Sequence, residues 1–354
     1  VDPFEALKTY GADAIRWYFY TNSAPWLPNR FYGKAVTEGQ NKFMGTLWNT
    51  YAFYVLYAEI DQFDPTKHAL EYDKLSVMDR WLLSKMHSMV KAVDDNLEHY
   101  RIPEAGRALE DFVDDMSNWY VRRSRERFWA PGMEQDKVNA YMTLYTALVT
   151  VAKAAAPMIP FMTENMYQNL VRNLDSNAPE SIHLCDFPVA QEDQIDLELE
   201  ENMDEVLKIV KAGREVRNTS GIKNRQPIAK MFVKAEKVLP AYFVEIMEDE
   251  LNVKSVEFTD AVEAFTTFTF KPQLRTLGKK YGKLVPAISA YLKEVDGNAF
   301  MAELREKGEA TFNVDGSAVT LAMDDVLVDT KEKDGFVSGG NNTLTVVLDT
   351  NLTP

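Results

Sequence analysis

Residues 118–129 carry the side chains best suited to bind an anionic ligand that also offers flat rings. The segment reads Asn-Trp-Tyr-Val-Arg-Arg-Ser-Arg-Glu-Arg-Phe-Trp, with four arginines, one acid and four aromatic side chains. Guanidinium groups match phosphate oxygens, and aromatic rings stack on unpaired bases. Because the chain as a whole has a formal net charge of -15, this cationic segment indicates a local anion site. Pairing of the arginines with nearby acids is the alternative.

Individual roles follow from the helical spacing of this segment. We expect phosphate contacts from Arg122, Arg123, Arg125 and Arg127, and base stacking from Trp119, Tyr120 or Trp129. At 100° per residue, the apolar stripe of residues 105, 109, 112, 116 and 119 continues into Arg123 and Arg127. The buried face would then become cationic as the helix leaves the core, and Trp119 is equally a candidate for the last core residue.

Two further basic clusters occur later in the chain. Residues 214–230 hold five bases against one acid, and Lys223 and Arg225 are their candidate contacts. Residues 271–283 hold five bases and no acid, with candidate contacts at Lys279, Lys280 and Lys283. Solvated basic loops are the alternative for both clusters. Together the three clusters favour extended contact with a nucleic-acid backbone.

The composition sets the class of protein. With 354 residues, 46% hydrophobic and 26% charged, the chain predicts two or three folded domains. No apolar run approaches the ~18 residues of a membrane span. The single cysteine, Cys185, excludes an internal disulfide and a cysteine-cluster zinc site, and it favours a reducing cytoplasm. The first residue is Val1 rather than methionine, so we expect a piece of a longer chain.

Enzymatic constellations are missing from the sequence. The four histidines show no paired ligand spacing, and neither a phosphate-binding Gly-Lys-Ser/Thr loop nor a Gly-x-Ser-x-Gly elbow is present. Acid pairs such as Asp94-Asp95 sit in helical patterns, where solvation explains them. We therefore expect no catalytic residue and no metal site in this chain.

Apolar periodicity predicts the elements that position these clusters. The first half shows stripes of period 3.6, typical of an antiparallel helical bundle, over residues 36–60, 77–98, 105–119, 136–156 and 163–174. Thr163 is the expected N-cap of the last helix, after Pro157 and Pro160 stop or kink the one before it.

The second half predicts a smaller α+β domain. An acidic run with eight acids and no base, residues 192–205, separates the two halves as a linker or a solvated helix face. Expected helices cover residues 200–217, 240–251 and 284–307. Expected strands cover residues 181–187, 228–233, 253–258, 265–270, 310–314, 319–322 and 343–348.

Five segments resemble isoleucyl-tRNA synthetases, in the branch that eukaryotes share with some bacteria and archaea. Residues 1–18, 79–84 and 118–129 resemble isoleucyl, valyl and leucyl enzymes alike. Residues 221–227 (Gly-Ile-Lys-Asn-Arg-Gln-Pro) and 276–283 (Thr-Leu-Gly-Lys-Lys-Tyr-Gly-Lys) favour the isoleucyl type. The resemblance covers essentially the whole chain and corresponds to the C-terminal part of these class I enzymes.

The resemblance implies a domain division and a partner. Residues 1–34 would be a stem-contact segment, 35–180 the helical anticodon-binding domain, 181–204 an acidic linker and 205–354 a truncated α+β appendage. The partner would be the tRNA for isoleucine, together with a catalytic core in the same polypeptide. The protein would be a cytoplasmic monomer with no membrane contact.

The family's catalytic motifs lie upstream of this region, so the resemblance implies that this piece is inactive alone. ATP and magnesium would serve the parent enzyme, and no cofactor is expected in the fragment. Two alternatives stay open. The chain could be the same region of a valyl- or leucyl-type ligase, or a helical scaffold whose acidic run docks a basic protein.

Overall fold

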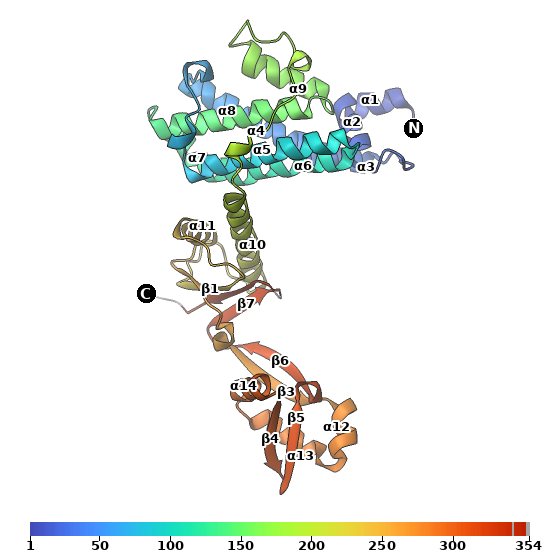
Figure 1. Cartoon of the computed structure of the whole chain (residues 1–354), viewed down its shortest axis with the longest axis vertical. Helices are drawn as coiled ribbons and strands as arrows, with labels where there is room; N and C mark the ends of the chain where they lie inside the picture. The colour runs from blue at the N-terminus through green and yellow to red at the C-terminus, as the bar shows by residue number, and fades with distance from the viewer. Residues whose placement is uncertain (342, 352–354) are drawn as a thin grey trace. The chain divides into compact units, whose positions relative to one another are not determined.

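The computed structural model describes residues 1–341 and 343–351. The chain divides into two compact units, Val1–Glu200 and Glu201–Pro354. Figure 1 shows the first as helices and the second as strands with helices. In the part of the chain that the structure describes, no helix is long and apolar enough to cross a membrane. The predicted class, a mainly α fold with a helical bundle followed by a smaller α+β part, is confirmed.

The first unit consists of helices and short helical turns. Its α-helices are α1 (Pro3–Tyr10), α2 (Ala12–Thr21), α3 (Gly33–Gly39), α4 (Thr46–Asp61), α5 (Val77–Glu98), α6 (Ile102–Asp114), α7 (Arg122–Trp129), α8 (Gln135–Ala155) and α9 (Pro160–Tyr167). Three π-helical segments interrupt them, namely η1 (Gln40–Gly45), η4 (Asp115–Val121) and η5 (Gln168–Arg172). Short 3₁₀ turns are η2 (Pro65–Lys67), η3 (Tyr72–Lys74), η6 (Ile182–Leu184) and η7 (Glu192–Gln194).

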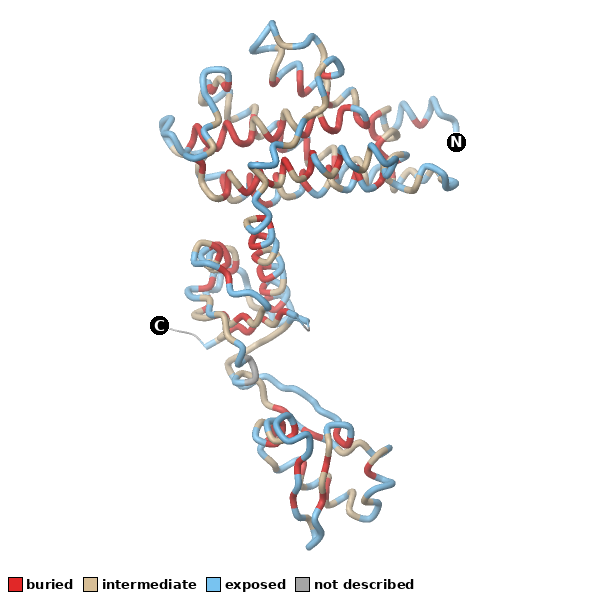
Figure 2. The backbone as a smooth tube through the Cα atoms, in the orientation of Figure 1, coloured by how far each residue is buried: buried red, intermediate tan, exposed pale blue. Residues whose placement is uncertain are grey.

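The core of this unit lies between α5, α6 and α8, which pack against one another. Figure 2 shows the buried residues of these helices on the faces that they turn inward. On α5, Leu82, Met86 and Val93 are buried at helical spacing, as the periodicity predicted. Ser76 begins α5 as its N-cap, with its hydroxyl accepting the Asp79 N–H at 3.2 Å.

Helix α2 holds the turn between α8 and α9. The Arg16 guanidinium donates to the carbonyls of Met158 and Pro157, and the Asp13 carboxylate accepts the N–H of Met162 at 2.7 Å. Asp13 therefore supplies an acceptor at the N-terminus of α9 from another helix. The prediction that Thr163 is the N-cap is wrong, because α9 already begins at Pro160 and Thr163 is buried inside it.

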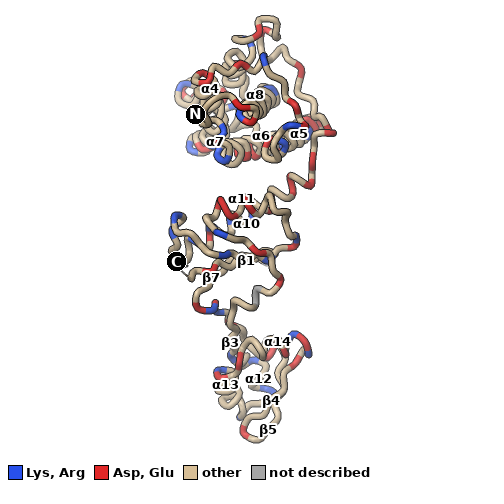
Figure 3. Tube along the Cα trace, turned by 90° about the vertical axis from the view of Figure 1, so that its left-hand side faces the viewer, with Lys and Arg blue, Asp and Glu red and all other residues tan. Residues whose placement is uncertain are grey.

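The segment after the bundle is irregular. The strand predicted at residues 181–187 is a 3₁₀ turn instead, in which the Ser181 hydroxyl accepts the His183 N–H. The acidic run, visible as red segments in Figure 3, continues into α10 (Leu197–Thr219). On α5, Ser84 accepts the Asp196 N–H at 2.8 Å and His87 accepts the Gln191 N–H at 3.2 Å. These bonds hold the start of the run against the bundle, and burial lowers the pKa of His87.

The second unit combines sheets and helices. Its helices are α10, α11 (Ala241–Leu251), α12 (Leu274–Tyr281), α13 (Val285–Glu294) and α14 (Gly297–Lys307), with 3₁₀ turns η8 (Val262–Phe265), η9 (Gly282–Leu284) and η10 (Met323–Asp325). Its strands are β1 (Lys230–Lys234), β2 (Val256–Phe258), β3 (Thr266–Pro272), β4 (Glu309–Val314), β5 (Ser317–Ala322), β6 (Val326–Glu332), β7 (Phe336–Gly340) and β8 (Thr345–Asp349). The sequence did not predict β6 and β7.

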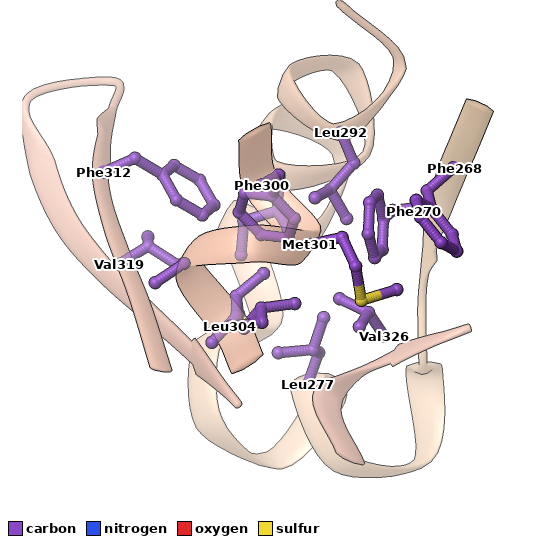
Figure 4. Packing of buried hydrophobic residues seen from close by; sticks show 13 residues of the cluster. Phe268, Phe270, Leu277, Leu292, Phe300, Met301, Leu304, Phe312, Val319 and Val326 are labelled. Carbon is purple, nitrogen blue, oxygen red and sulfur yellow. The ribbon is translucent and has the colours of Figure 1, made fainter. Parts of the chain in front are cut away.

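The described strands form three sheets. One has the order β2-β1-β8-β7, with β1 parallel to β2 and antiparallel to β8, and the others are the pairs β3-β6 and β4-β5. Figure 4 shows one core of this unit, where Phe270 and Phe312 contact Phe300 of α14. Leu277 of α12 is fully buried in the same core, and it thereby fixes which face of α12 turns outward.

Candidate nucleic-acid interface

Helix α7 carries the arginine segment, and a π-helical segment sets its rotation. A π turn holds more residues than an α turn, so η4 moves the buried face on by one position. At four-residue steps after Met116 the buried residues are Tyr120, Ser124 and Phe128, and Trp119 and Val121 are buried beside Tyr120. The Phe128 ring packs on Tyr141 with ring centroids 4.9 Å apart. The buried face extrapolated from residues 105–119 therefore does not pass through Arg123 and Arg127. These two side chains lie next to the buried face of the helix instead of on it.

Arg127 belongs to an ion-pair network inside the bundle. Its guanidinium donates to both carboxylate oxygens of Asp79, at 2.7 and 2.8 Å, and to the carboxylate of Asp136 at 2.9 Å. Asp79 is fully buried. Although burial by itself lowers the pKa of Arg127, the hydrogen bonds and charge of Asp79 raise it above the ordinary arginine value. The predicted phosphate contact of Arg127 does not fit this geometry, because its donors are already bonded.

The stacking predictions for Tyr120 and Trp119 are contradicted by burial. Tyr120 is 0% exposed and donates its hydroxyl to Asp79 at 2.6 Å. Burial, and then the charge of Asp79, raise the pKa of Tyr120 well above its ordinary value. Trp119 is 4% exposed, so neither ring offers a face to a base. The alternative for Trp119, that it is a core residue, is confirmed.

The other three arginines form what we call the α7 cationic surface: Arg122, Arg123 and Arg125. The guanidinium groups of Arg122 and Arg123 lie over the Trp119 ring, 5.3 and 5.6 Å from its centroid. The Nε of Arg122 donates to the Asn118 carbonyl at 3.0 Å. Arg125 is exposed and makes no hydrogen bond or ion pair with any residue that the structure describes. Arg122 is exposed as well, whereas Arg123 is half-buried, and the phosphate contacts of these three arginines stay predictions.

Trp129 ends α7 and is 56% exposed. The turn that follows it is held from α8, where the buried Lys137 ammonium donates to the Ala130 carbonyl at 2.7 Å and pairs with Asp61 at 2.8 Å. A large exposed ring on an anchored turn can stack on a base without first being ordered. Of the three predicted stacking residues, only Trp129 has the exposure that stacking requires.

The basic loop at residues 221–227 is organised by a buried arginine. Arg217 is 1% exposed, and its guanidinium donates to the carbonyls of Lys223 (2.9 Å), Gln226 (3.0 Å), Leu251 (2.6 Å) and Asn252 (3.1 Å). Burial lowers the pKa of Arg217. The loop carbonyls that bond to Arg217 therefore face inward, while the side chains of Lys223 and Arg225 are exposed.

The third basic cluster lies on α12 and the turn after it. Lys279, Lys280 and Lys283 are exposed, and the Lys280 ammonium also pairs with the buried Asp325 carboxylate at 2.8 Å. The hydrogen bond that Lys280 donates to Asp325, and then the charge of Asp325, raise the pKa of Lys280. This pair gives Lys280 a structural role, and its predicted contact with a phosphate stays a prediction. Arg275 is also exposed, one turn before Lys279, and was not among the predicted contacts.

One polar surface was missed from the sequence. Residues of α4, α9 and η5 line a cleft of about 600 Å³, which we call the amide cleft: Tyr51, Asn165, Gln168, Asn169, Arg172 and Asn173. Residues 165, 168, 169, 172 and 173 follow helical spacing, but their face is polar rather than apolar. A search for apolar stripes or basic clusters does not detect it. A search for amides at three- and four-residue steps would have found it.

Comparison with known proteins shows what the chain is similar to. Residues 79–233 match the family described as the anticodon-binding domain of tRNA ligase. The isoleucine–tRNA ligase of Clostridium tetani is 48% identical over 353 residues, covering 100% of this chain and 34% of that protein. The chain is homologous to the C-terminal region of bacterial isoleucyl-tRNA synthetases. The Clostridium acetobutylicum isoleucine–tRNA ligase is also 48% identical over 354 residues, with the same two shares.

More distant relatives agree with this homology. Isoleucine–tRNA ligase 2 of Bacillus cereus is 39% identical over 360 residues, covering 100% of this chain and 34% of that protein. The chain thus spans about a third of the length of these isoleucyl-tRNA synthetases. The relatives named here are bacterial, and the expected placement in the branch shared with eukaryotes is not supported. Among solved structures, a ternary complex of an Agrobacterium radiobacter leucyl enzyme aligns with a TM-score of 0.43 and 14% identity, over 55% of this chain and 22% of that one. A likeness this weak carries no argument.

Proposed function

We propose that this chain is the tRNA-binding, anticodon-recognising C-terminal portion of an isoleucine–tRNA ligase. The observation that supports the proposal most is the α7 cationic surface, which lies within the match to the anticodon-binding domain. Arginine forks on a rigid helix suit the phosphates of an RNA stem. Trp129 adjoins that surface in sequence, and base–aromatic stacking contributes about 1–3 kcal/mol per base.

Within this function the candidate contacts divide by role. Arg122, Arg123 and Arg125 contact backbone phosphates of the anticodon stem, and Trp129 stacks on an unpaired base. Lys223 and Arg225, on the loop held by Arg217, and Lys279 and Lys283 beside α12 add further backbone contacts. In the corresponding domain division, residues 1–34 are a stem-contact segment, 35–180 the anticodon-binding domain, 181–204 an acidic linker and 205–354 an appendage.

The whole protein would attach isoleucine to its tRNA with ATP and magnesium, through a catalytic core in the same polypeptide. It would act in the cytoplasm as a monomer. This portion contributes by holding the tRNA so that its acceptor end reaches that core. Alone it should not catalyse exchange of pyrophosphate into ATP, and an exchange assay on the purified chain tests that expectation.

The test of tRNA identity is a cross-titration. Isoleucine, valine and leucine tRNAs are each titrated with the chain over a series of salt concentrations. The proposal expects the tightest binding for isoleucine tRNA, with affinity that falls as salt rises. Equal affinity for all three tRNAs at every salt concentration would contradict isoleucine identity. Capture of a protein with no effect of tRNA would favour the scaffold alternative.

A further inference from the structure

Neither helix formation nor packing of the bundle core explains why so many amide side chains line the amide cleft. Asn165, Gln168, Asn169, Arg172 and Asn173 share one face of α9 and η5, opposite the Tyr51 side chain of α4. Asparagine is a poor residue for a helix interior, yet three occur within nine positions. The cleft includes a π-helical segment, and π-helical segments are frequent at functional sites.

Hydrogen bonds inside the cleft orient two of the amides. The Asn169 side-chain N–H donates to the Tyr51 hydroxyl at 2.6 Å. The Gln168 side-chain amide donates to the Glu164 carboxylate at 2.6 Å and to the Glu180 carbonyl at 2.8 Å. Because the nitrogens of these amides bond to the protein, their carbonyl oxygens remain as acceptors. Two preorganised acceptors therefore lie on neighbouring positions of the same helix.

Donors complete the surface. The Arg172 guanidinium is held by the carbonyls of Ser176 and Ala178, the latter at 2.8 Å through the same Nη1 nitrogen. Both bonds use Nη1, so the other edge of the guanidinium can donate elsewhere. Asn165 and Asn173 are exposed, and their side chains make no hydrogen bond with any described residue. Each of these asparagines offers both a donor and an acceptor.

The charge of the residues that line the cleft favours a nucleobase over a phosphate as its ligand. Within the described chain, no acid lines the cleft, and Arg172 is its one cation. The nearby Glu164 carboxylate is turned to other partners, accepting from the Ser181 hydroxyl and the Ile182 N–H. A phosphate site needs several cations or a cluster of backbone N–H groups. An array of amides with one arginine instead matches the donor and acceptor pattern on the edge of a nucleobase.

We propose that the amide cleft binds an unstacked base of single-stranded RNA by its hydrogen-bonding edge. The carbonyl oxygens of Gln168 and Asn169 accept N–H groups of the base, while Arg172, Asn165 and Asn173 donate to its ring nitrogen or carbonyl groups. This inference rests on the proposed function, because it takes a tRNA as the source of the base.

The test compares the chain with the double variant Gln168→Ala/Asn169→Ala in titrations of isoleucine tRNA. Loss of base hydrogen bonds should weaken binding by about 5- to 160-fold, at ~1–3 kcal/mol for each recognised base. Because both side chains are uncharged, the slope of log affinity against log salt should stay the same. Alanine favours helix, so the variant should fold. The exposed Asn49→Ala on α4 is the matched control and should bind like the parent chain.

A second variant guards against a folding artefact. Tyr51→Phe keeps the buried ring and removes only the hydroxyl that orients Asn169, so it should weaken binding by a few-fold at unchanged slope. Parent-like binding by Gln168→Ala/Asn169→Ala would overturn the inference and leave the cleft to a protein partner. A flattened salt slope in that variant would also overturn it, in favour of phosphate contact. Failure of the unmodified chain to bind any tRNA would instead overturn the proposed function.

Discussion

Replacing Arg127 should destabilise the helical unit without acting directly on tRNA binding. The guanidinium makes two bonds to Asp79, which is fully buried and whose other contact is the hydroxyl of buried Tyr120. Arg127→Met leaves that carboxylate without its cation. Removing one partner of a buried pair costs about 3–5 kcal/mol. At ~2–4 °C per kcal/mol for a unit of this size, the melting temperature should fall by roughly 6–20 °C.

The neighbouring Arg125 provides the matched control. Arg125→Met changes the same residue type two positions away, on the exposed side of α7. Its stability should stay within about 0.5 kcal/mol of the parent chain, while its affinity for tRNA falls. Urea unfolding followed by circular dichroism gives the first quantity, and the tRNA titration gives the second.

A double-mutant cycle completes this prediction. Asp79→Asn combined with Arg127→Met removes the uncompensated charge, so the two changes together should cost less than their sum by more than 1 kcal/mol. The reasoning is refuted if Arg127→Met unfolds like the parent chain, or if it weakens tRNA binding at unchanged stability. Either result would make Arg127 a candidate phosphate contact again.

Three further predictions concern the basic surfaces and the second unit. Arg122→Gln/Arg125→Gln should weaken tRNA binding and reduce the salt slope by up to about 2, and an unchanged slope would count against phosphate contact. Arg217→Met should cost about 2–4 kcal/mol in urea unfolding, because buried carbonyls lose their donor, whereas Arg225→Met, at an exposed loop position, should stay within about 0.5 kcal/mol of the parent chain. Burial alone raises the pKa of Asp325, but bonds from Lys280 and the Ala322 N–H lower it below its ordinary value. Its stabilisation is therefore present above about pH 4 and is lost as pH falls through the folded-state pKa. Asp325→Asn should flatten that acid dependence, and an unaltered pH profile would refute the role.

Most of the helical half could be predicted from the sequence because its cores follow a period of 3.6. The stripe over residues 77–98 has the same bounds as α5, and α8 lies within one residue of the prediction at each end. Helix starts set by distant residues could not be predicted in the same way. The acceptor at the start of α9 comes from Asp13, some 150 positions earlier in the chain, so Thr163 was the wrong choice.

The candidate site shows where periodic extrapolation fails. A fixed step of 100° predicted a cationic face through Arg123 and Arg127, but η4 adds a π turn that no composition signal announces. Asp79 and Arg127 are 48 positions apart, and no sequence pattern indicates that they form an ion pair. The sequence prediction therefore took a structural arginine for a ligand-binding one. The ion pair between Lys280 and Asp325 was missed for the same reason, because Asp325 lies 45 positions later.

The strands of the second half were predicted where apolar residues alternate over a buried face. Strand β4 meets this condition, with alternate residues buried. Strand β6 does not, since only its first residue is buried. Its pairing with β3 depends on backbone hydrogen bonds across seven registered positions, which leave no pattern in the side chains.

Protection mapping of isoleucine tRNA by this chain shows whether the helical unit holds the anticodon arm. Hydroxyl-radical cleavage of the bound tRNA reports which backbone positions the protein covers. The account predicts protection of the anticodon stem and loop, weakened when Arg122 and Arg125 are replaced by glutamine. Protection restricted to the acceptor arm, or none at concentrations where binding is complete, would contradict it.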